Sequence, residues 1–354
     1  MGGEANVFMF SATDHAHMAR ALRLAARGLH TTQPNPRVGC VIARGDGIVG
    51  EGWHQRAGGP HAEVSALREA GARARGATAY VTLEPCGLHG RTPPCADALV
   101  AAGIARVVVA GEDASQREGG APDRLRAAGI PVETGLLRDA ARELNRGFFS
   151  RVERGRPWLR AKLAMSLDGR TALANGASKW ITGEAARADN QRWRARSSAI
   201  LTGIGTVLAD DPALTVRWPR TEPVEGGDAF VAPLRVVLDR DLRTPRAARV
   251  LDGSAPTLVL HACGKVAADI ADTKAELAAV AGTADGLDPG DVLRTLAARG
   301  ANEVQVEAGP TLAGALFAAG LVDELLLYVA PVLLGGDARP LFELPPLTRL
   351  ASGW

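Results

Sequence analysis

The stretch HAEVSALREAGARARGATAYVTLEPCGLHGRTPPC, residues 61–95, decides how the first half of the chain folds. Residues 61–74 have the pattern of a helix, and ATAYVTL (77–83) is typical of a strand. CADALVAAG (95–103) then predicts a second helix. His61, Glu63, Cys86 and Cys95 therefore fall at or near the ends of these elements, which is a suitable place for a site.

The alternation of helix and strand extends to both sides of this stretch. Upstream, Asp14 can cap a helix in which apolar residues recur at three- and four-residue steps, and VGCVIA (38–43) predicts a strand. Downstream, ARVVVAG (105–111) predicts a strand and APDRLRAAGI (121–130) a helix. This order predicts an α/β layer around a mainly parallel sheet, opened by one antiparallel hairpin.

Gly45, Gly47 and Gly50 satisfy the spelling G-x-G-x-x-G of dinucleotide-binding loops. That motif needs a helix directly after the glycines, whereas Ile48 begins another strand-like run. We therefore interpret Asp46-Gly47 as a hairpin turn and exclude a dinucleotide site at this position.

A polar helix at residues 138–154 and the segment GRP (155–157) separate this half from a second one. There, strands are expected at 158–166, 198–203, 234–239, 256–261, 303–308 and 324–331, and helices at 183–196, 288–299 and 311–320. A chain of 354 residues suits two domains of roughly 100–200 residues. We expect domains at 1–150 and 157–354, with a mobile surface loop at 217–233.

Composition excludes several classes of protein. Forty-one Lys and Arg against thirty-nine Asp and Glu give a net charge of +2, which provides no field that attracts nucleic acid. Four cysteines are too few for a disulfide framework, and two of them near His-x-Glu suit metal ligation in a reducing compartment. The chain shows neither a signal-peptide pattern nor a run of about 18 apolar residues, so we expect a cytoplasmic protein without membrane association.

His61, Cys86 and Cys95 supply the ligand set of a catalytic zinc site, in which three side chains bind the ion and water takes the fourth position. Both cysteines lie beside prolines near a predicted helix start, where the helix dipole favours thiolate. If His61 lies at the helix entrance, Glu63 can carry a proton from zinc-bound water to a leaving amine. Zinc deaminases divide the roles in this way, although their usual signature has two residues between the cysteines and this chain has eight.

Two other interpretations of these residues stay open. His89 could be the fourth ligand of a structural zinc site, or the cysteines could form a buried pair without metal. We favour the catalytic site, because His-x-Glu and two Pro-Cys pairs occur together at the expected element ends. Cys40 and Cys263 have no ligand-like neighbours and are expected to be core or incidental thiols.

Longer motifs in both halves resemble one family, the RibD family of bifunctional deaminase/reductases of riboflavin biosynthesis. The similarity covers almost the whole chain and rests on TTQPNPRVGCVI (31–42), residues 76–95, TGIGTVLADDPALTVR (202–217) and residues 306–336. It implies a cytidine-deaminase-like α/β/α domain followed by a dihydrofolate-reductase-like α/β domain. The implied reactions are zinc-dependent hydrolytic deamination of 2,5-diamino-6-ribosylamino-4(3H)-pyrimidinone 5′-phosphate and NADPH-dependent reduction of the ribosyl side chain, giving 5-amino-6-ribitylamino-uracil 5′-phosphate.

The resemblance also implies roles for single residues. His61, Cys86 and Cys95 would bind zinc, Glu63 would carry the proton, and Asn35 would bond the pyrimidine edge, although an Asn before Pro is also an ordinary turn residue. His54, Gln55 and His89 are expected around the same pocket. The implied NADPH-binding residues are Ala164, Trp180, Thr206, Asp210, Arg240, Gly309, Pro310, Thr311, Leu312, Ala313, Gly314 and Ala315. The implied substrate-binding residues of the second half are Ser178, Arg194, Leu214, Arg217 and Glu307.

Physical chemistry supports parts of this assignment. EAGPTLAGAL (307–316) ends a strand and opens a helix, whose first N–H groups suit a cofactor pyrophosphate. Arg194 and Arg217 suit a clamp on the substrate's 5′-phosphate, because guanidinium binds phosphate in a bidentate fork; outside this motif each would be an ordinary surface charge. Arg240 can neutralise the cofactor's 2′-phosphate. Lys162 and Asp168 either face the pocket or stabilise a turn.

Two segments differ from the family pattern. EDASQREGGAP (112–122) stands where the family has Asp-Pro-Asn-Pro and spaced glycines, and LTRLASGW stands where a final strand is expected. The first difference leaves open a reductase-only homologue with an impaired or altered-specificity deaminase domain. A nucleic-acid-binding module that holds a flipped base is disfavoured, because only 4% of the residues are aromatic. By similarity, a homodimer through the reductase domain is expected.

Overall fold

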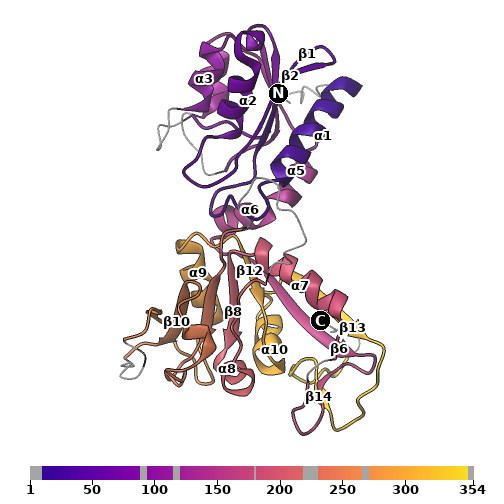
Figure 1. Ribbon diagram of the computed structural model, residues 1–354, viewed down its shortest axis with the longest axis vertical. Coiled ribbons are helices and arrows are strands. Elements are labelled where there is room, and N and C mark those ends of the chain that lie inside the picture. Colours follow the sequence, from indigo (N-terminus) through magenta and orange to yellow (C-terminus); the bar gives the residue numbers. More distant parts are fainter. Residues whose placement is uncertain are drawn as a thin grey trace. The chain divides into compact units, whose positions relative to one another are not determined.

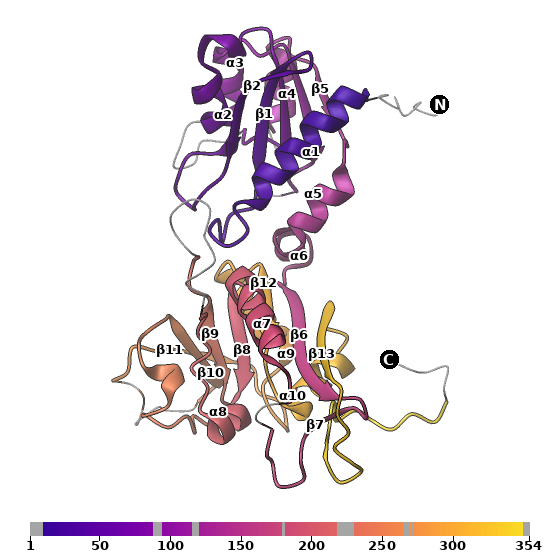
Figure 2. The same ribbon diagram turned by 45° about the vertical axis from the view of Figure 1, so that its right-hand side comes forward.

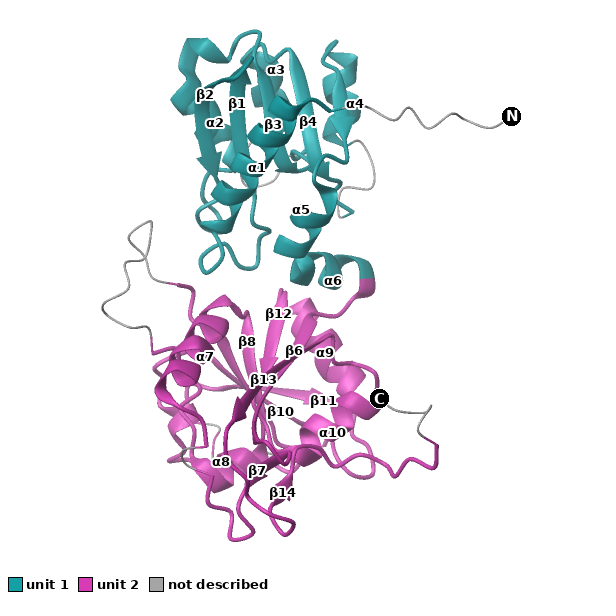
Figure 3. Ribbon diagram, turned by 90° about the vertical axis from the view of Figure 1, so that its right-hand side faces the viewer, with its two compact units in different colours: residues 1–153, 224–229 teal, residues 154–223, 230–354 magenta. Residues whose placement is uncertain are grey.

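The computed structural model describes residues 10–87, 94–114, 120–178, 181–217, 230–264, 270 and 272–349. The described residues form two compact units, divided between Glu153 and Arg154 (Figures 1 and 3). Each unit has its own sheet and its own hydrophobic core. Within the described ranges, no helix combines the length and apolar character needed to cross a membrane. Most of the loop expected at 217–233 lies outside the described residues.

The first unit is built on a five-stranded sheet in the order β2-β1-β3-β4-β5. β1 runs antiparallel to β2 and β3, whereas β3, β4 and β5 run parallel, which confirms the predicted sheet. The strands are β1 (Gly39–Arg44), β2 (Gly47–Trp53), β3 (Thr78–Leu83), β4 (Arg106–Gly111) and β5 (Val132–Thr134). The helices are α1 (Ala12–Ala26), α2 (Ala62–Ala70), α3 (Cys95–Ala101), α4 (Ala121–Ala127), α5 (Arg138–Leu144) and α6 (Arg146–Arg154), with a short 3₁₀ helix at Gly71–Ala74.

Helices cover both faces of this sheet (Figure 2). α2, α3 and α4 share one core with Ile42 and Val109, whereas α1 and α5 share the other with Val41 and Val108. Neighbouring strand residues enter opposite cores because successive side chains of a strand point to opposite faces. The unit is an α/β/α sandwich, which confirms the fold class predicted for it.

The second unit is built on a seven-stranded parallel sheet in the order β11-β10-β9-β8-β12-β6-β13. Its strands are β6 (Trp158–Ser166), β8 (Ala199–Gly203), β9 (Leu234–Leu238), β10 (Thr257–Ala262), β11 (Glu276–Val280), β12 (Glu303–Val306) and β13 (Glu324–Ala330). A separate antiparallel pair joins β7 (Arg170–Ala172) and β14 (Arg339–Pro340). The helices are α7 (Glu184–Arg196), α8 (Ile204–Asp210), α9 (Pro289–Ala298) and α10 (Pro310–Ala318), with a 3₁₀ turn at Arg249–Leu251. The predicted α/β class of this half is confirmed.

The start of α1 differs from the prediction. The N-cap is Ser11, not Asp14, and the hydroxyl of Ser11 accepts the backbone N–H of Asp14 while the Asp14 carboxylate accepts the N–H of Ser11. Asp14 therefore takes the acidic position of a capping box. Its carboxylate also binds Arg106 (2.7 Å) and the hydroxyl of Tyr80 (2.8 Å). The sequence correctly indicated a helix cap near Asp14, but Ser11 is the N-cap and Asp14 is the third residue of the helix.

The hairpin between β1 and β2 confirms that the glycine-rich stretch is not a dinucleotide loop. Its turn lies at Gly45-Asp46, one residue before the predicted position, because Arg44 pairs with Gly47 and Gly45 has a positive φ of 56°. Gly50 has a different role: a Cβ there would lie 2.3 Å from the carbonyl oxygen of Ala66 in α2. The spacing of these glycines therefore reflects one turn and one close helix–strand contact.

The polar helix predicted at 138–154 is two helices, interrupted at Asn145. The Asn145 side chain accepts the backbone N–H of Arg37 (2.8 Å) and donates to its carbonyl (2.9 Å). This tertiary bridge accounts for the break, and nothing near 145 in the sequence reveals it. The elements β5, β7, β11, β14 and α8 were also missed, because they are short or, in β11, rich in Ala rather than in β-branched residues.

Buried charges join three strands of the second sheet. Arg160 on β6 is fully buried, and its guanidinium contacts the carboxylates of Glu303 on β12 (2.9 Å) and Glu324 on β13 (2.8 Å). Glu303 is also bound by Arg196 of α7 (2.8 Å). The indole of Trp193 covers the Arg160 guanidinium at 4.3 Å. These pairs link β6, β12, β13 and α7, the elements that carry part of the predicted reductase site.

We expect Arg160→Met to lower the free energy of unfolding of the second unit by about 3–5 kcal/mol, because buried carboxylates lose a cationic partner. The matched control is Arg294→Met, whose side chain is 66% exposed and pairs with Asp288 and Asp291 at the surface. That change should cost less than about 1 kcal/mol. Denaturant unfolding of both full-length variants measures the difference, and equal effects would contradict a structural role for the buried network.

Candidate functional site

The three predicted metal ligands come together in the first unit. His61 is the N-cap residue of α2, Cys86 follows β3, and Cys95 is the first residue of α3. The Nδ1 atom of His61 lies 3.2 Å from Sγ of Cys95 and 3.6 Å from Sγ of Cys86, and the three donor atoms all lie within 4.8 Å of one another. Elements distant in sequence thus present one nitrogen and two sulfurs to a common point.

The donor atoms fit a tetrahedral zinc ion. With Zn–N of about 2.05 Å and Zn–S of about 2.3 Å, two ligands of a tetrahedron lie roughly 3.6 Å apart. The measured N–S distances of 3.2 and 3.6 Å match that edge. The pKa of the Cys86 thiol is lowered by hydrogen bonds from Cys95 and His61, which favours the thiolate that a metal requires.

Glu63 has the placement expected of an acid/base residue. It lies in the first turn of α2, is 3% exposed and lines the same pocket as His61 and Cys86. Glu63 is not one of the three residues whose donor atoms lie together. Burial raises the pKa of its carboxyl, which brings proton exchange closer to neutral pH.

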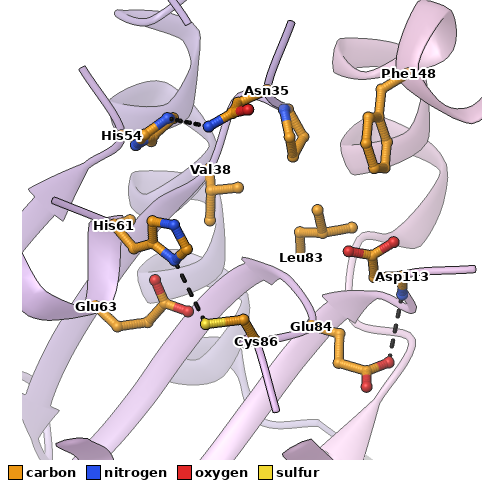
Figure 4. A pocket seen from close by; sticks show the side chains of 12 residues that line it. Asn35, Val38, His54, His61, Glu63, Leu83, Glu84, Cys86, Asp113 and Phe148 are labelled. Carbon is orange, nitrogen blue, oxygen red and sulfur yellow. Dashed lines mark hydrogen bonds between the residues drawn. The ribbon is translucent and has the colours of Figure 1, made fainter. Parts of the chain in front are cut away.

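The group of three candidate metal ligands borders a pocket of about 250 Å³ (Figure 4). Val38, Leu83 and Phe148 supply apolar walls, with Phe148 contributed by α6. Asn35 and His54 lie on one side of Val38, and Glu84 and Asp113 lie beyond Leu83, where the Glu84 carboxylate accepts the backbone N–H of Asp113 at 3.3 Å. A small planar molecule would meet apolar faces and polar edges in this space.

Some pocket residues agree with expectation and others were missed. Asn35 and His54 line the pocket, whereas Gln55 is exposed and is not among the lining residues. His89 lies outside the described residues, so the structural four-ligand alternative is not addressed. Glu84 was missed although it stands two residues before Cys86. Phe148 could not be found from sequence, because its helix follows more than fifty residues after the second cysteine.

Among the described residues, the other two cysteines belong to no group of potential metal ligands. Cys40 is fully buried in the core, and Cys263 is exposed, with its thiol donating to the carbonyl of Val280 at 3.6 Å. Both placements agree with the expectation of core or incidental thiols. All four cysteines of the chain are free.

In the second unit, the predicted substrate residues Arg194 and Glu307 bind each other. Arg194 of α7 donates from Nε (2.6 Å) and Nη2 (2.7 Å) to the Glu307 carboxylate, and from Nη1 to the carbonyl of Thr215 (2.8 Å). Burial by itself raises the pKa of Glu307, but Arg194 and Lys162 lower it to about 2. The guanidinium is thus a buried ion-pair partner in this structure rather than a solvated surface charge.

The remaining predicted substrate residues are less closely grouped. Arg217 is exposed, and its backbone N–H donates to the side chain of Gln191 at 2.8 Å. Leu214 is buried in the core with a positive φ of 49°. Ser178 is half-buried, and its carbonyl accepts the N–H of Ile181. Their roles in substrate binding stay predictions.

The predicted cofactor residues gather at the carboxyl ends of adjacent strands. Gly309 is the N-cap of α10, Pro310 through Ala315 form its first turns after β12, and Thr206 and Asp210 lie on α8 directly after β8. β8 and β12 are parallel neighbours, so both helices start at the same sheet edge. Cβ atoms placed on Gly309 or Gly205 would meet no atom within 4 Å, which leaves open space at this edge.

Other residues of this half have mixed outcomes. Ala164 lies on β6, and Arg240 follows β9 and donates to the carbonyl of Ala284 at 2.6 Å. Trp180 lies outside the described residues. Asp168 accepts the backbone N–H groups of Leu334 (3.1 Å) and Gly335 (2.8 Å), in agreement with a turn-stabilising role.

One segment near the end of the described chain contacts α10. Thr311 donates its hydroxyl to the carboxylate of Glu343 at 2.7 Å, and a Cβ on Gly314 would lie 2.0 Å from the backbone oxygen of Glu343. Phe317 and Phe342 pack edge to face at 4.6 Å. The side of α10 that includes Gly314 is therefore packed against the segment of Phe342 and Glu343.

Comparisons with known proteins agree in both halves. Residues 11–111 match the model of the cytidine and deoxycytidylate deaminase zinc-binding region, and residues 157–352 match the RibD C-terminal domain. The riboflavin biosynthesis protein RibD of Escherichia coli is 51% identical over 344 residues, covering 96% of this chain and 93% of that protein.

Solved structures give the same result. A RibD structure from Acinetobacter baumannii has a TM-score of 0.88 and 45% identity, and a deaminase/reductase from Thermotoga maritima has a TM-score of 0.81 and 31% identity. Each comparison covers 96% of this chain and 93% of the other. The chain therefore belongs to the RibD family, and it is a bifunctional deaminase and reductase of riboflavin biosynthesis.

Proposed function

We propose that the first unit removes the 2-amino group of 2,5-diamino-6-ribosylamino-4(3H)-pyrimidinone 5′-phosphate by hydrolysis. The second unit then reduces the ribosyl side chain with NADPH, giving 5-amino-6-ribitylamino-uracil 5′-phosphate. The observation that carries the proposal is the convergence of His61, Cys86 and Cys95 beside buried Glu63 in one pocket. We assign the deaminase to residues 1–150 and the reductase to 157–354, which is supported by the separate units and separate family matches.

In the deaminase pocket, His61, Cys86 and Cys95 would hold zinc. When bound, zinc lowers the pKa of water and so provides hydroxide near neutral pH. Glu63 holds a proton on its carboxyl and delivers it to the departing amine, a role that its burial favours. Val38, Leu83 and Phe148 exclude bulk water from the ring, while Asn35 orients one edge.

In the reductase, Gly309 and the first turns of α10, together with Thr206 and Asp210, would bind NADPH. The start of α10 offers N–H groups and open space at a sheet edge, which suits a pyrophosphate. NADPH supplies the hydride, and the protein's task is to position the sugar chain. Arg194 and Glu307 form a buried pair, and Arg194 would bind the substrate's phosphate by exchanging Glu307 for it.

We also propose the binding partners and the cellular location of the enzyme. The substrates are small molecules, and the net charge of +2 offers no attraction for nucleic acid. By similarity to the family, we propose that the second unit forms a homodimer. The enzyme works in the cytoplasm without membrane contact. Support for a reducing compartment comes from four free cysteines, two of them placed as metal ligands.

The direct test uses the full-length protein with zinc, NADPH and the diaminopyrimidine phosphate. We expect one equivalent of ammonia and one of oxidised NADPH per substrate, and much slower oxidation with NADH. A parallel assay supplies the pre-deaminated intermediate. NADPH oxidation with that intermediate but no ammonia from the diamine would support a reductase-only enzyme. The absence of both signals would refute the proposal.

Glu63→Gln should reduce ammonia release by roughly 10²- to 10⁴-fold, because the amide cannot exchange the proton. The three metal donors are unaltered, so the zinc content should stay at one per chain. NADPH oxidation of the pre-deaminated intermediate serves as the internal control and should be unchanged. Loss of both activities would contradict two independent sites.

Arg194→Met should raise the reductase KM for the intermediate roughly 10- to 100-fold, since a charge-assisted contact is lost. The variant also leaves Glu307 buried without its main partner, so the pKa of the Glu307 carboxyl rises from about 2. In the wild type the charged Glu307 carboxylate contributes stability that is fully present above pH 4.5 and is lost as the pH falls towards 2. In the variant the rise in the Glu307 pKa diminishes this contribution to stability above pH 4.5.

The double variant Arg194→Met/Glu307→Leu separates binding from stability. It removes the unpaired charge and should recover unfolding stability while KM stays high. Recovery of KM together with stability would make Arg194 a purely structural residue.

A further inference from the structure

Asn35 and His54 are polar residues of the deaminase pocket that the metal site leaves unused. The backbone N–H of Asn35 donates to the carbonyl of Thr32 at 2.9 Å, which fixes the turn that carries it. Its side-chain nitrogen lies 3.0 Å from Nε2 of His54 (Figure 4). His54 is only 3% exposed, so its ring has little water to bond with.

The second ring nitrogen of His54 determines which partner donates. Nδ1 lies 3.0 Å from the carbonyl oxygen of Pro60, and a carbonyl can only accept. Nδ1 therefore carries the proton, and in a neutral imidazole Nε2 is then an acceptor. Asn35 must offer its NH₂ group to His54, and its carbonyl oxygen lies on the side away from the ring, as Figure 4 shows.

The ring of His54 is held on several sides. Its backbone N–H donates to the carbonyl of Val38 at 2.9 Å, directly after β2. The ring packs edge to face on His61, with centroids 5.5 Å apart and planes at 84°. Pro60, which accepts from Nδ1, immediately precedes this metal ligand. One side chain thus connects the segment of the first metal ligand with the turn of Asn35.

We propose that His54 is a positioning residue for the deamination, which holds the Asn35 amide with its carbonyl oxygen available to the substrate. The pocket then selects a pyrimidine edge that presents N–H groups and disfavours an edge that presents a lone pair. The inference rests on the proposed deaminase function. It adds the residue that makes Asn35 present an acceptor, and not a donor, to the substrate. His54 acts through Asn35 and does not touch the reacting atoms.

Two substitutions of His54 separate its two hydrogen bonds. His54→Asn keeps an N–H donor for Pro60 but has no group that reaches Asn35, whereas His54→Gln extends an oxygen to the former Nε2 position. We expect His54→Asn to lower kcat/KM for ammonia release roughly 10- to 100-fold, chiefly through KM. His54→Gln should recover a large part of this loss.

A double-mutant cycle with Asn35→Ala tests the route of the effect. If His54 acts through Asn35, His54→Asn should cause little further loss in the Asn35→Ala background. Independent, multiplying losses would overturn the inference, and so would an unchanged KM in His54→Asn. A loss of zinc from His54→Asn would also overturn it, because the ring would then serve the metal site.

The control is His17→Gln, a buried histidine of the same unit whose ring bonds the carbonyl of Gly45 at 3.0 Å and does not line the pocket. Its kinetics should match the wild type. Failure of the proposed function is distinguishable, because the wild type itself would then release no ammonia. Unchanged kinetics of His54→Asn beside an active wild type would refute only the positioning role.

Discussion

The close approach of α2 to β2 is the constraint on which the deaminase site depends. Cβ atoms on Gly50 and Gly52 would each lie 2.3 Å from a carbonyl oxygen of α2, so only glycine allows the contact. The helix meets the strand with Ala62, Ala66 and Ala70, which are fully or almost fully buried. This packing fixes where α2 begins, and therefore where His61 and Glu63 lie relative to the loop after β3.

The second unit relies on a different constraint. Its sheet is parallel, so the ends of β8 and β12 place α8 and α10 at one edge. Charges replace part of the apolar contact between this sheet and α7, where Arg196 pairs with Glu303 and Arg194 pairs with Glu307. Because such pairs need defined partners, they hold α7 in one position beside the strands.

The sequence predicted most of the architecture and the three side chains that converge as candidate metal ligands. Apolar periodicity is local, and His61, Cys86 and Cys95 stand beside element ends that local patterns reveal. Pairings across the fold were not accessible in the same way. The break at Asn145 depends on Arg37, and the state of Arg194 depends on Glu307, 113 residues later. The contribution of Phe148 to the pocket likewise follows from packing and not from any motif.

His61 occupies the N-cap of α2 but makes no side-chain capping bond, because its ring faces the thiols. Ser, Thr, Asp or Asn at such a position typically stabilises a helix by about 1 kcal/mol relative to a residue that does not cap. A lineage that no longer needed deamination would gain stability by replacing this histidine. Folding alone therefore disfavours histidine at position 61, which supports the metal-binding role proposed for this residue.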